Sequence, residues 1–524
     1  MFDKDCFVSF AAVTCVKFLF IPLYKSTDFE VHRNWMAITY QKHLKDWYID
    51  ETSEWTLDYP PLFAWFEFLL AHLAKYFDSQ MLRVENLNYT SYQTIFFMRA
   101  SVILSDLVYF YGVSRIFKLM KASRKNLKST VDDPWIKKEV ILGMLFLWNP
   151  GLLLVDHIHF QYNGFLSGIL LISIADIFEE RYVRASFWFA VLINLKHIYL
   201  YLAPAYFLFQ LKNYCCKKDT NEVNFYKCLC MKITKLGSVV IVTTLFSFGP
   251  FIYLGQTKQV LLRLFPVKRG LTHSYWAPNV WALYNFADRL LSFIVYKLGF
   301  YKQENLQACS TQGLVQECEP FIFFSISPTV TILLALLSFV PVGWIIWKKS
   351  ASPQVFINSI ILCSFGSFLF GYHVHEKAIL LIILPLTIPA VIIEDEAKMY
   401  AFLSVVGHFS LLPLLHKEGE TVLKIALVLL HAVYTFSSLS QLHQMKTPAA
   451  STLEKMYFGG LALLQVFYSF GAKMLQLEQK LPFLPLMLIS TYCALGVVYS
   501  WLKYCCYTLE IKTNFQEKIK LKKY

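Results

Sequence analysis

Acidic side chains within one short stretch are the first candidates for chemistry in this 524-residue sequence. Asp28 and Glu30 follow closely after an apolar run, and Asp58 precedes two consecutive prolines. A carboxylate held beside an apolar wall tends to have a raised pKa, which suits a general base that removes a proton from a hydroxyl group. Because prolines restrict the backbone, we expect Asp58 to be presented from a rigid turn. The alternative for each residue is a structural role, as a helix cap or in a solvated turn.

A basic cluster in the C-terminal half complements these carboxylates. His373, His375 and Lys377 lie between two apolar runs and supply cationic or donor groups of the kind that bind a phosphate. Arg269 is expected at the same face and would add charge, although interfacial snorkelling is the alternative for it. The spacing His-x-His-Glu also suggests a metal site, but H-E-x-x-H is absent, so a metalloprotease is excluded.

Two further polar groups interrupt the apolar sequence. Asp156, His157 and His159 form a cluster after the third apolar run. Lys196 and His197 lie in the middle of a later run, where we expect two short helices to meet at mid-membrane depth. Ionisable groups at that depth are costly on a lipid face, so these two side chains are expected to point into a cavity.

The elements that must position these residues are long apolar runs. Hydrophobic residues make up 56% of the chain and charged residues 16%, which argues against a soluble globular domain. Only helices satisfy their own backbone hydrogen bonds in lipid, so residues 1–524 are predicted to form a single, all-α polytopic membrane domain. Windows of about 20 apolar residues recur, and we count about 14 transmembrane helices.

The distribution of the basic residues predicts the topology. The net charge is +13, but Lys and Arg fall in short loops between apolar runs, so nucleic acid is not an expected partner. This pattern places both termini in the cytosol and two long loops, residues 25–93 and 255–327, in the lumen. The second loop contains HSYWAPNVWALYNFADRLL, which we expect to form an amphipathic helix at the membrane interface.

Chemistry-bearing residues therefore collect at one membrane face. A transporter more often places its ionisable residues within the spans, near the midplane. The observed distribution favours an enzyme that acts at the lumenal surface.

Three other features bear on the compartment. Asn88 begins an Asn-Tyr-Thr glycosylation sequon in the first lumenal loop. Cys309 and Cys318 share the second loop, where a disulfide and two free thiols are both compatible with the sequence. Lys520 and Lys522 near the C-terminus resemble a di-lysine signal for retrieval to the endoplasmic reticulum, and a basic juxtamembrane tail is the alternative. We predict an endoplasmic reticulum membrane protein.

The chain resembles, over essentially its whole length, the dolichyl-phosphate-glucose-dependent glucosyltransferases of the asparagine-linked glycosylation pathway, a C-type glycosyltransferase family. The matching segments are STDFEVHRNW, SEWTLDYPP, VDHIHFQYNG, KHIYLYLAPAY, FPVKRG, YWAPNVWALYN and GYHVHEKAIL. They resemble the branch that adds the second glucose more than the branch that adds the first, whose initial motif has a glycine before the aspartate. The resemblance implies the C-type glycosyltransferase fold.

The resemblance also implies a reaction and residue roles. Glucose would pass from dolichyl phosphate glucose to a monoglucosylated, dolichyl-pyrophosphate-linked oligosaccharide, with inversion and formation of an α-1,3 bond. Asp28 would be the general base, and Glu30 and Asp58 would orient the acceptor or support that base. The residues that would bind the donor phosphate are His373, His375, Lys377 and Arg269. No metal or other cofactor is implied; the partners would be the donor, the lipid-linked acceptor and membrane lipids.

Three alternatives stay open on the sequence alone. The first is the sister branch of the family, which would use the acceptor that carries no glucose. The second is a lipid or ion transporter, which would keep its functional polar residues at the membrane midplane. The third is a non-catalytic subunit or scaffold of the glycosylation machinery, in which Asp28 would be replaceable.

Overall fold

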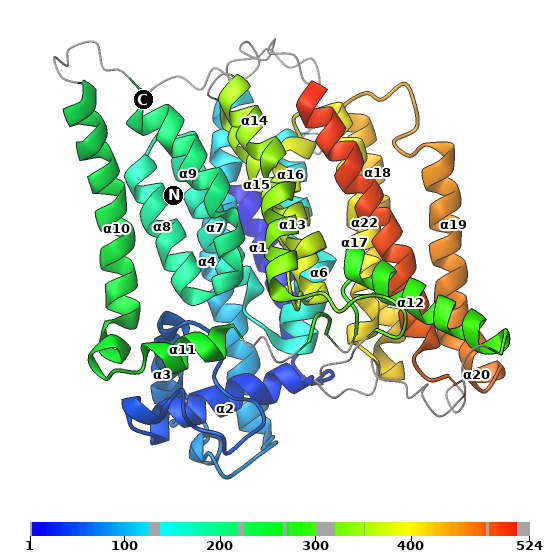
Figure 1. Cartoon of the computed structure of the whole chain (residues 1–524), viewed down its shortest axis with the longest axis horizontal. Coiled ribbons are helices and arrows are strands. Elements are labelled where there is room, and N and C mark those ends of the chain that lie inside the picture. The colour runs from blue at the N-terminus through cyan, green and yellow to red at the C-terminus, as the bar shows by residue number, and fades with distance from the viewer. Residues whose placement is uncertain are drawn as a thin grey trace.

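The computed structural model describes residues 3–124, 137–217, 225–265, 270–273, 275–299, 320–349, 352–477 and 481–510. Over these residues the secondary structure is helical, apart from one isolated β-bridge between Thr272 and Val374. Most of the long helices run side by side in a bundle (Figure 1). The predicted all-α class is confirmed.

The bundle is built from helices of very different lengths. They are α1 (Lys4–Leu19), α4 (Tyr92–Arg124), α5 (Lys138–Leu147), α6 (Pro150–Leu152), α7 (Asn163–Phe178), α8 (Tyr182–Leu195), α9 (Ala203–Gln210), α10 (Phe225–Tyr253), α13 (Pro328–Ser338), α14 (Val340–Lys348), α15 (Pro353–Phe370), α16 (Leu380–Ala390), α17 (Glu394–Ser410), α18 (Thr421–Leu442), α19 (Thr452–Val466), α20 (Ala472–Met474) and α22 (Leu484–Glu510).

Among the described residues, eight helical segments are long and apolar enough to cross a membrane. They are Tyr92–Ala122, Lys138–Phe160, Phe225–Tyr253, Pro328–Lys348, Pro353–Phe370, Glu394–Leu414, Thr421–Leu442 and Leu484–Glu510. Shorter apolar helices, among them α7 and α8, accompany them. The prediction of a polytopic membrane protein is confirmed, whereas the count of fourteen spans stays a prediction.

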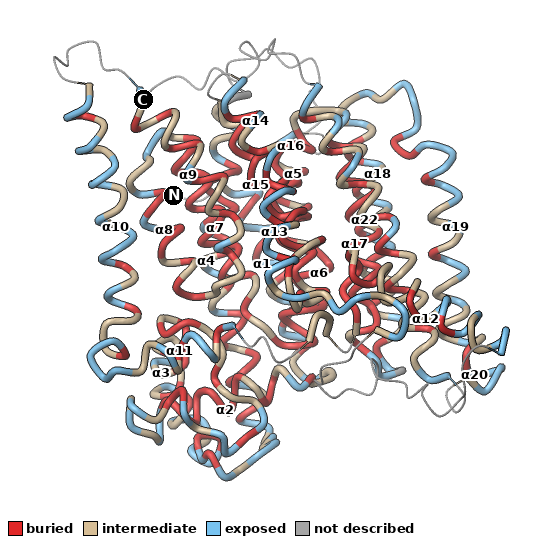
Figure 2. Tube along the Cα trace, viewed as in Figure 1, coloured by how far each residue is buried: buried red, intermediate tan, exposed pale blue. Residues whose placement is uncertain are grey.

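Burial is concentrated in the middle of the bundle (Figure 2). Helices α7 and α15 are buried on nearly all sides, whereas α10 and α19 at the two edges expose large apolar side chains such as Phe246 and Leu463. Outer helices with apolar surfaces are what a lipid environment requires. Inside, Gly168 of α7 lies so close to α4 that an added Cβ atom would meet the Tyr109 Cα atom at 2.6 Å. This close approach of small residues locks α4 against α7.

A separate group of helices caps one end of the bundle (Figure 1). We call α2 (Thr27–Gln41), α3 (Pro61–Ala74) and the segment between them the head. Pro61 occupies the first turn of α3, as expected for a residue that lacks a backbone N–H. The predicted first lumenal loop, residues 25–93, thus has helical structure of its own.

Two more helices lie near this end of the bundle. Helix α11 (Thr257–Leu264) joins the head, because the Arg263 guanidinium pairs with Glu51 at 2.8 Å. Helix α12 (Val280–Lys297) lies across the bundle direction (Figure 1) and exposes Leu290, Phe293 and Ile294. The predicted helix in the second loop is confirmed, and its place at the membrane interface stays a prediction.

The predicted break near Lys196 is also present. Helix α8 ends at Leu195, a 3₁₀ turn covers His197–Leu202, and α9 begins at Ala203. Pro204 lies in the first turn of α9, so it starts this helix and does not break it. Lys196 contacts Asn163 at the start of α7 and Tyr59 in the head, so it lies where the head meets the bundle, and its depth in the membrane stays a prediction.

Candidate active site

Asp28 lies at the junction between the head and the bundle. The Ser26 hydroxyl caps α2 by accepting a hydrogen bond from the Asp28 backbone N–H at 3.1 Å. Asp28 therefore lies in the first turn of the helix. Its Oδ2 atom accepts hydrogen bonds from Lys377 Nζ at 2.5 Å and Gln161 Nε2 at 2.6 Å, and it lies 3.3 Å from His159 Nε2. Within the described residues nothing donates to Oδ1, and the side chain is 20% exposed. One carboxylate oxygen is held, and the other accepts no hydrogen bond from the described residues.

The charge state of Asp28 differs from the prediction. Burial opposes its ionisation, but the Lys377 ammonium and the His159 ring outweigh burial and hold the pKa of Asp28 well below its ordinary value of 3.8. The predicted upward shift is therefore wrong. The prediction rested on the apolar surroundings of Asp28. The cation that reverses the shift, Lys377, lies 349 positions further along the chain and could not be paired with Asp28 from the sequence.

An unusual helical turn brings His159 and Gln161 to Asp28. Residues Leu153–Phe160 form a π-helix, a conformation that is rare and often found at functional sites. It ends at Phe160, whose φ of 102° lies in the region that side chains rarely adopt. Such strain persists only where the surroundings hold it. Here Arg99 does so, donating to the carbonyl oxygens of His157 at 2.8 Å and Ile158 at 2.7 Å.

The three polar residues of this turn point to different places, because neighbouring helical positions face different directions. His159 alone reaches Asp28. Asp156 accepts from the Asn163 side chain at 2.9 Å and from the Gly164 amide, and so caps α7. His157 turns into the bundle and contacts Asp106 at 2.8 Å. The predicted cluster therefore divides into one site residue and two supporting ones.

Glu30 and Asp58, the two carboxylates predicted to support Asp28, have different surroundings. Residues two apart on a helix do not face each other, and Glu30 turns away from the Asp28 contacts. Both of its oxygens bind Arg33, at 2.6 and 2.7 Å, and Arg33 in turn donates to the Met81 carbonyl. Asp58 is half-buried just before α3 and interacts electrostatically with Lys196, as Asp28 does. Asp58 therefore shares a neighbour, Lys196, with Asp28, whereas Glu30 pairs with Arg33.

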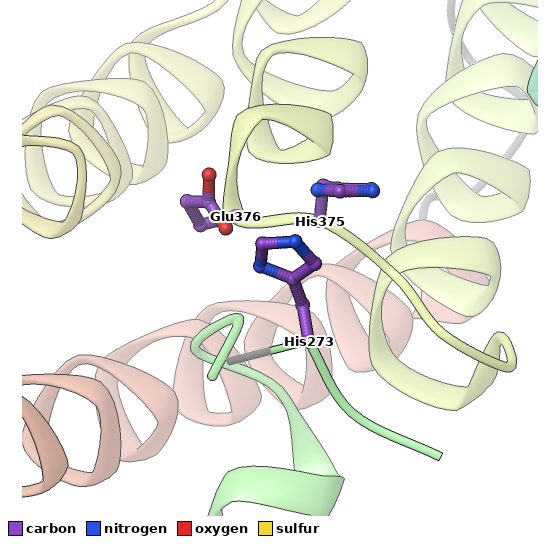
Figure 3. Close-up of side chains that lie close together, drawn as sticks. All are labelled: His273, His375 and Glu376. Carbon is purple, nitrogen blue, oxygen red and sulfur yellow. The ribbon is translucent and has the colours of Figure 1, made fainter. Parts of the chain in front are cut away.

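His273, His373 and His375 form a histidine cluster, and Figure 3 shows two of them, His273 and His375, close together beside Glu376. The bridge between Thr272 and Val374 aligns the two segments that carry it. The ring of His273 lies 4.3 Å from that of His375 and 5.7 Å from that of His373. His273 was not predicted from the sequence, because it lies alone in an aromatic stretch about a hundred positions before its partners.

The cluster suits an anion better than a cation. Burial lowers the pKa of His375 well below 6.5, and His273, Lys377 and His373 add to this effect, which favours the neutral ring with a single N–H. Its Nδ1 atom has no hydrogen-bond partner among the described residues. The positive charge comes from Lys377. A neutral imidazole donor next to an ammonium group is a suitable environment for one phosphate group.

The same cluster contains the metal-ligand candidates. Ligand atoms of His273, His375 and Glu376 all lie within 4.8 Å of one another, and two histidines with a carboxylate are a known zinc set. However, burial raises the pKa of Glu376, which disfavours the charged form that binds metal, although Lys377 opposes this shift. The adjacent Lys377 ammonium also repels a divalent cation.

We therefore expect the purified protein to carry no stoichiometric metal at these residues and to keep its full turnover after treatment with EDTA. Elemental analysis and a transfer assay before and after chelation test this prediction. Loss of turnover that is restored by adding Zn²⁺ or Mn²⁺ would contradict it.

Several predicted residues have a different status. Arg269, Cys309, Cys318, Lys520 and Lys522 lie outside the described residues. Asn88 is exposed and has a φ of 57°, a conformation that asparagine tolerates. Its glycosylation stays a prediction.

Together, the fold and the site define a class of protein: a polytopic membrane enzyme with the groups needed to move a substituent from a phosphate carrier to a hydroxyl. The model of the ALG6, ALG8 glycosyltransferase family matches residues 13–504, and the chain belongs to this family.

Relatives from distant organisms match along almost the whole chain. A mouse (Mus musculus) protein named dolichyl pyrophosphate Glc1Man9GlcNAc2 alpha-1,3-glucosyltransferase is 47% identical over 492 residues, which is 93% of each chain. A Drosophila melanogaster protein with the same name, qualified as probable, is 43% identical and covers 97% of this chain and 95% of its own. The relative of that name from Arabidopsis thaliana is 42% identical over 94% of this chain and 96% of its own.

Proposed function

We propose that the protein transfers glucose from dolichyl phosphate glucose to the dolichyl-pyrophosphate-linked oligosaccharide Glc1Man9GlcNAc2 and forms an α-1,3 bond. The acceptor and the linkage are those in the names of its relatives. The observation that carries the proposal is the Asp28 carboxylate, with one oxygen held by Lys377 and the other left for an acceptor hydroxyl. The site faces the lumen of the endoplasmic reticulum, and both termini are cytosolic.

The reaction is one inverting displacement. Asp28 takes the proton of the acceptor hydroxyl, and the hydroxyl oxygen forms a bond to the anomeric carbon of the glucose. The bond from that carbon to the phosphate oxygen breaks, and its electron pair leaves with dolichyl phosphate. This leaving group is already a stable anion, so it needs charge stabilisation more than a proton. Lys377, His373 and His375 provide that stabilisation.

Lys377 has two successive roles in this scheme. In the structure it binds Asp28 and holds the pKa of that carboxyl down, which makes Asp28 a weak base. A donor phosphate bound at the histidine cluster competes for the same ammonium group. When Lys377 turns to the phosphate, the pKa of Asp28 rises and the carboxylate becomes a better base. Donor binding thereby prepares the base for the acceptor.

The direct test supplies purified protein with dolichyl phosphate glucose and acceptors that carry no glucose or one glucose. We expect transfer to the monoglucosylated acceptor alone, and the product linkage can be checked by digestion with a linkage-specific glucosidase. Transfer only to the unglucosylated acceptor would assign the chain to the sister branch of the family. Failure to transfer to either acceptor, with the donor intact, would favour the scaffold or transporter alternatives.

A further inference from the structure

Lys196 is a second lysine at the junction between the head and the bundle. It follows α8 directly, and its Nζ atom donates to the Asn163 side-chain oxygen at 3.2 Å. The same atom lies over the ring of Tyr59, 5.1 Å from the ring centre. Cation–π contacts of this kind fix an ammonium group without neutralising its charge. Lys196 thus contacts the bundle through Asn163 and the head through Tyr59.

A chain of hydrogen bonds connects Lys196 to the candidate base. Asn163, the partner of Lys196, donates to the Gln161 side-chain oxygen at 2.8 Å, and Gln161 donates to Asp28 at 2.6 Å. Because each amide in this chain has one donor end and one acceptor end, the contacts orient both side chains. The ammonium group of Lys196 therefore has a defined position relative to Asp28.

The surroundings of Lys196 differ from those of Lys377. Burial and the charge of Lys377 lower the pKa of Lys196 to about 8, while Asp156, Asp28 and Asp58 oppose this shift. Lys196 therefore interacts electrostatically with three carboxylates, whereas Lys377 contacts Asp28 and His159 directly and lies close in sequence to His375 of the histidine cluster. A phosphate is better suited to the Lys377 side, where the imidazole groups of the histidine cluster lie close to the ammonium group.

A cation among carboxylates is suited to a neutral ligand rich in hydroxyl groups. An ammonium group has three donors, and among the described residues Asn163 is the only hydrogen-bond acceptor recorded for Lys196. A sugar hydroxyl can accept from Lys196 and donate to a neighbouring carboxylate at the same time. Sites built to hydrogen-bond hydroxyls reject analogues that lack them, so such a residue contributes to selectivity.

We propose that Lys196 binds hydroxyl groups of a hexose next to the point of transfer and is a specificity-determining residue of the enzyme. The inference rests on the proposed glucosyl transfer. The hexose is either the glucose of the donor or the terminal sugar of the acceptor. Asn163 and Tyr59 are the positioning residues of this subsite, because they act by holding the ammonium group.

The test compares Lys196→Met, Lys196→Gln and Lys196→Arg in the transfer assay, with separate titrations of donor and acceptor. Loss of a hydrogen bond from a charged donor typically weakens binding about 10- to 100-fold, and we expect a change of this size in Lys196→Met. A raised KM for the donor identifies the donor glucose as the ligand, and a raised KM for the acceptor identifies the acceptor sugar. Because the ligand is neutral, Lys196→Gln, which keeps an N–H donor, should recover part of the loss.

Lys424→Met is the matched control. Lys424 is another buried lysine, and it donates to the backbone carbonyl oxygens of Leu412 and Leu415. Its replacement should lower thermal stability and leave both KM values unchanged. A series of deoxy donors and acceptors adds a second readout. Removal of the hydroxyl group bound by Lys196 should raise KM in the wild type and leave KM unchanged in Lys196→Met.

The outcomes separate the inference from the function on which it rests. Absence of transfer by the wild type would overturn the proposed function. Transfer by the wild type with unchanged KM and kcat in Lys196→Met would overturn the role of Lys196 alone. Equal losses in Lys196→Gln and Lys196→Met, with full activity in Lys196→Arg, would mean that the ligand is an anion, which also overturns the proposal. If Lys196→Met does not fold, unchanged KM and kcat in Lys196→Gln overturn the role of Lys196, and a raised KM in that variant supports it.

Discussion

Asp28→Asn is expected to reduce kcat by about 10²- to 10⁴-fold, the usual contribution of a general base. The amide keeps the size of the side chain but cannot take a proton from the acceptor hydroxyl. Because the substrates still bind, the KM values should change much less than kcat. Steady-state transfer to the monoglucosylated acceptor measures both quantities, and thermal unfolding of the detergent-solubilised protein checks that the variant is folded.

Asp78→Asn serves as the control for this substitution, since it makes the same change near the head. Asp78 accepts from the Gln80 amide and the Thr94 hydroxyl, each at 3.0 Å, and has a local structural role. Its variant should keep wild-type turnover. Equal activity of Asp28→Asn and the wild type would remove Asp28 from the mechanism and favour a non-catalytic role for the protein.

Lys377→Met should lower kcat/KM by about 10²- to 10³-fold, because the leaving phosphate loses its nearest cation. It should also change the pH dependence. In the wild type Lys377 holds the pKa of Asp28 well below 3.8, so the free enzyme keeps an ionised base down to acidic pH. Without Lys377 only His159 opposes the effect of burial, so the pKa of Asp28 rises. The acid limb of the kcat/KM profile should therefore move to higher pH, and the profile measured against pH for both proteins checks this.

Lys377→Arg separates charge from geometry. It keeps a cation beside Asp28, so the acid limb should stay near that of the wild type even if the rate falls. An acid limb that is unchanged in Lys377→Met would contradict the assignment of Asp28 as the titrating base. A fall in rate without any effect on the affinity for the donor would mean that Lys377 acts only through Asp28 and does not bind the donor phosphate.

Features that depend on a single segment were predictable from the sequence. The apolar runs became helices, because a chain in lipid must satisfy its backbone hydrogen bonds within each segment. The break after Leu195 followed from the polar residues at that position, and the non-helical segment that carries Asp58 followed from the two prolines after it. The motifs around Asp28 and Lys377 could be found in the same way, since their residue types and their apolar flanks are local properties.

The tertiary structure alone decided how these motifs meet. Asp28 and Lys377 are paired across 349 positions, and that pairing reverses the expected shift of the Asp28 pKa. The ring of His273 packs against that of His375, and Glu30 binds Arg33 and not the residues around Asp28. Hydropathy and spacing describe one segment at a time, whereas these contacts arise from how distant helices pack. The sequence therefore determined the class of the protein and its candidate groups, and the packing of the head on the bundle determined which of those groups share a site.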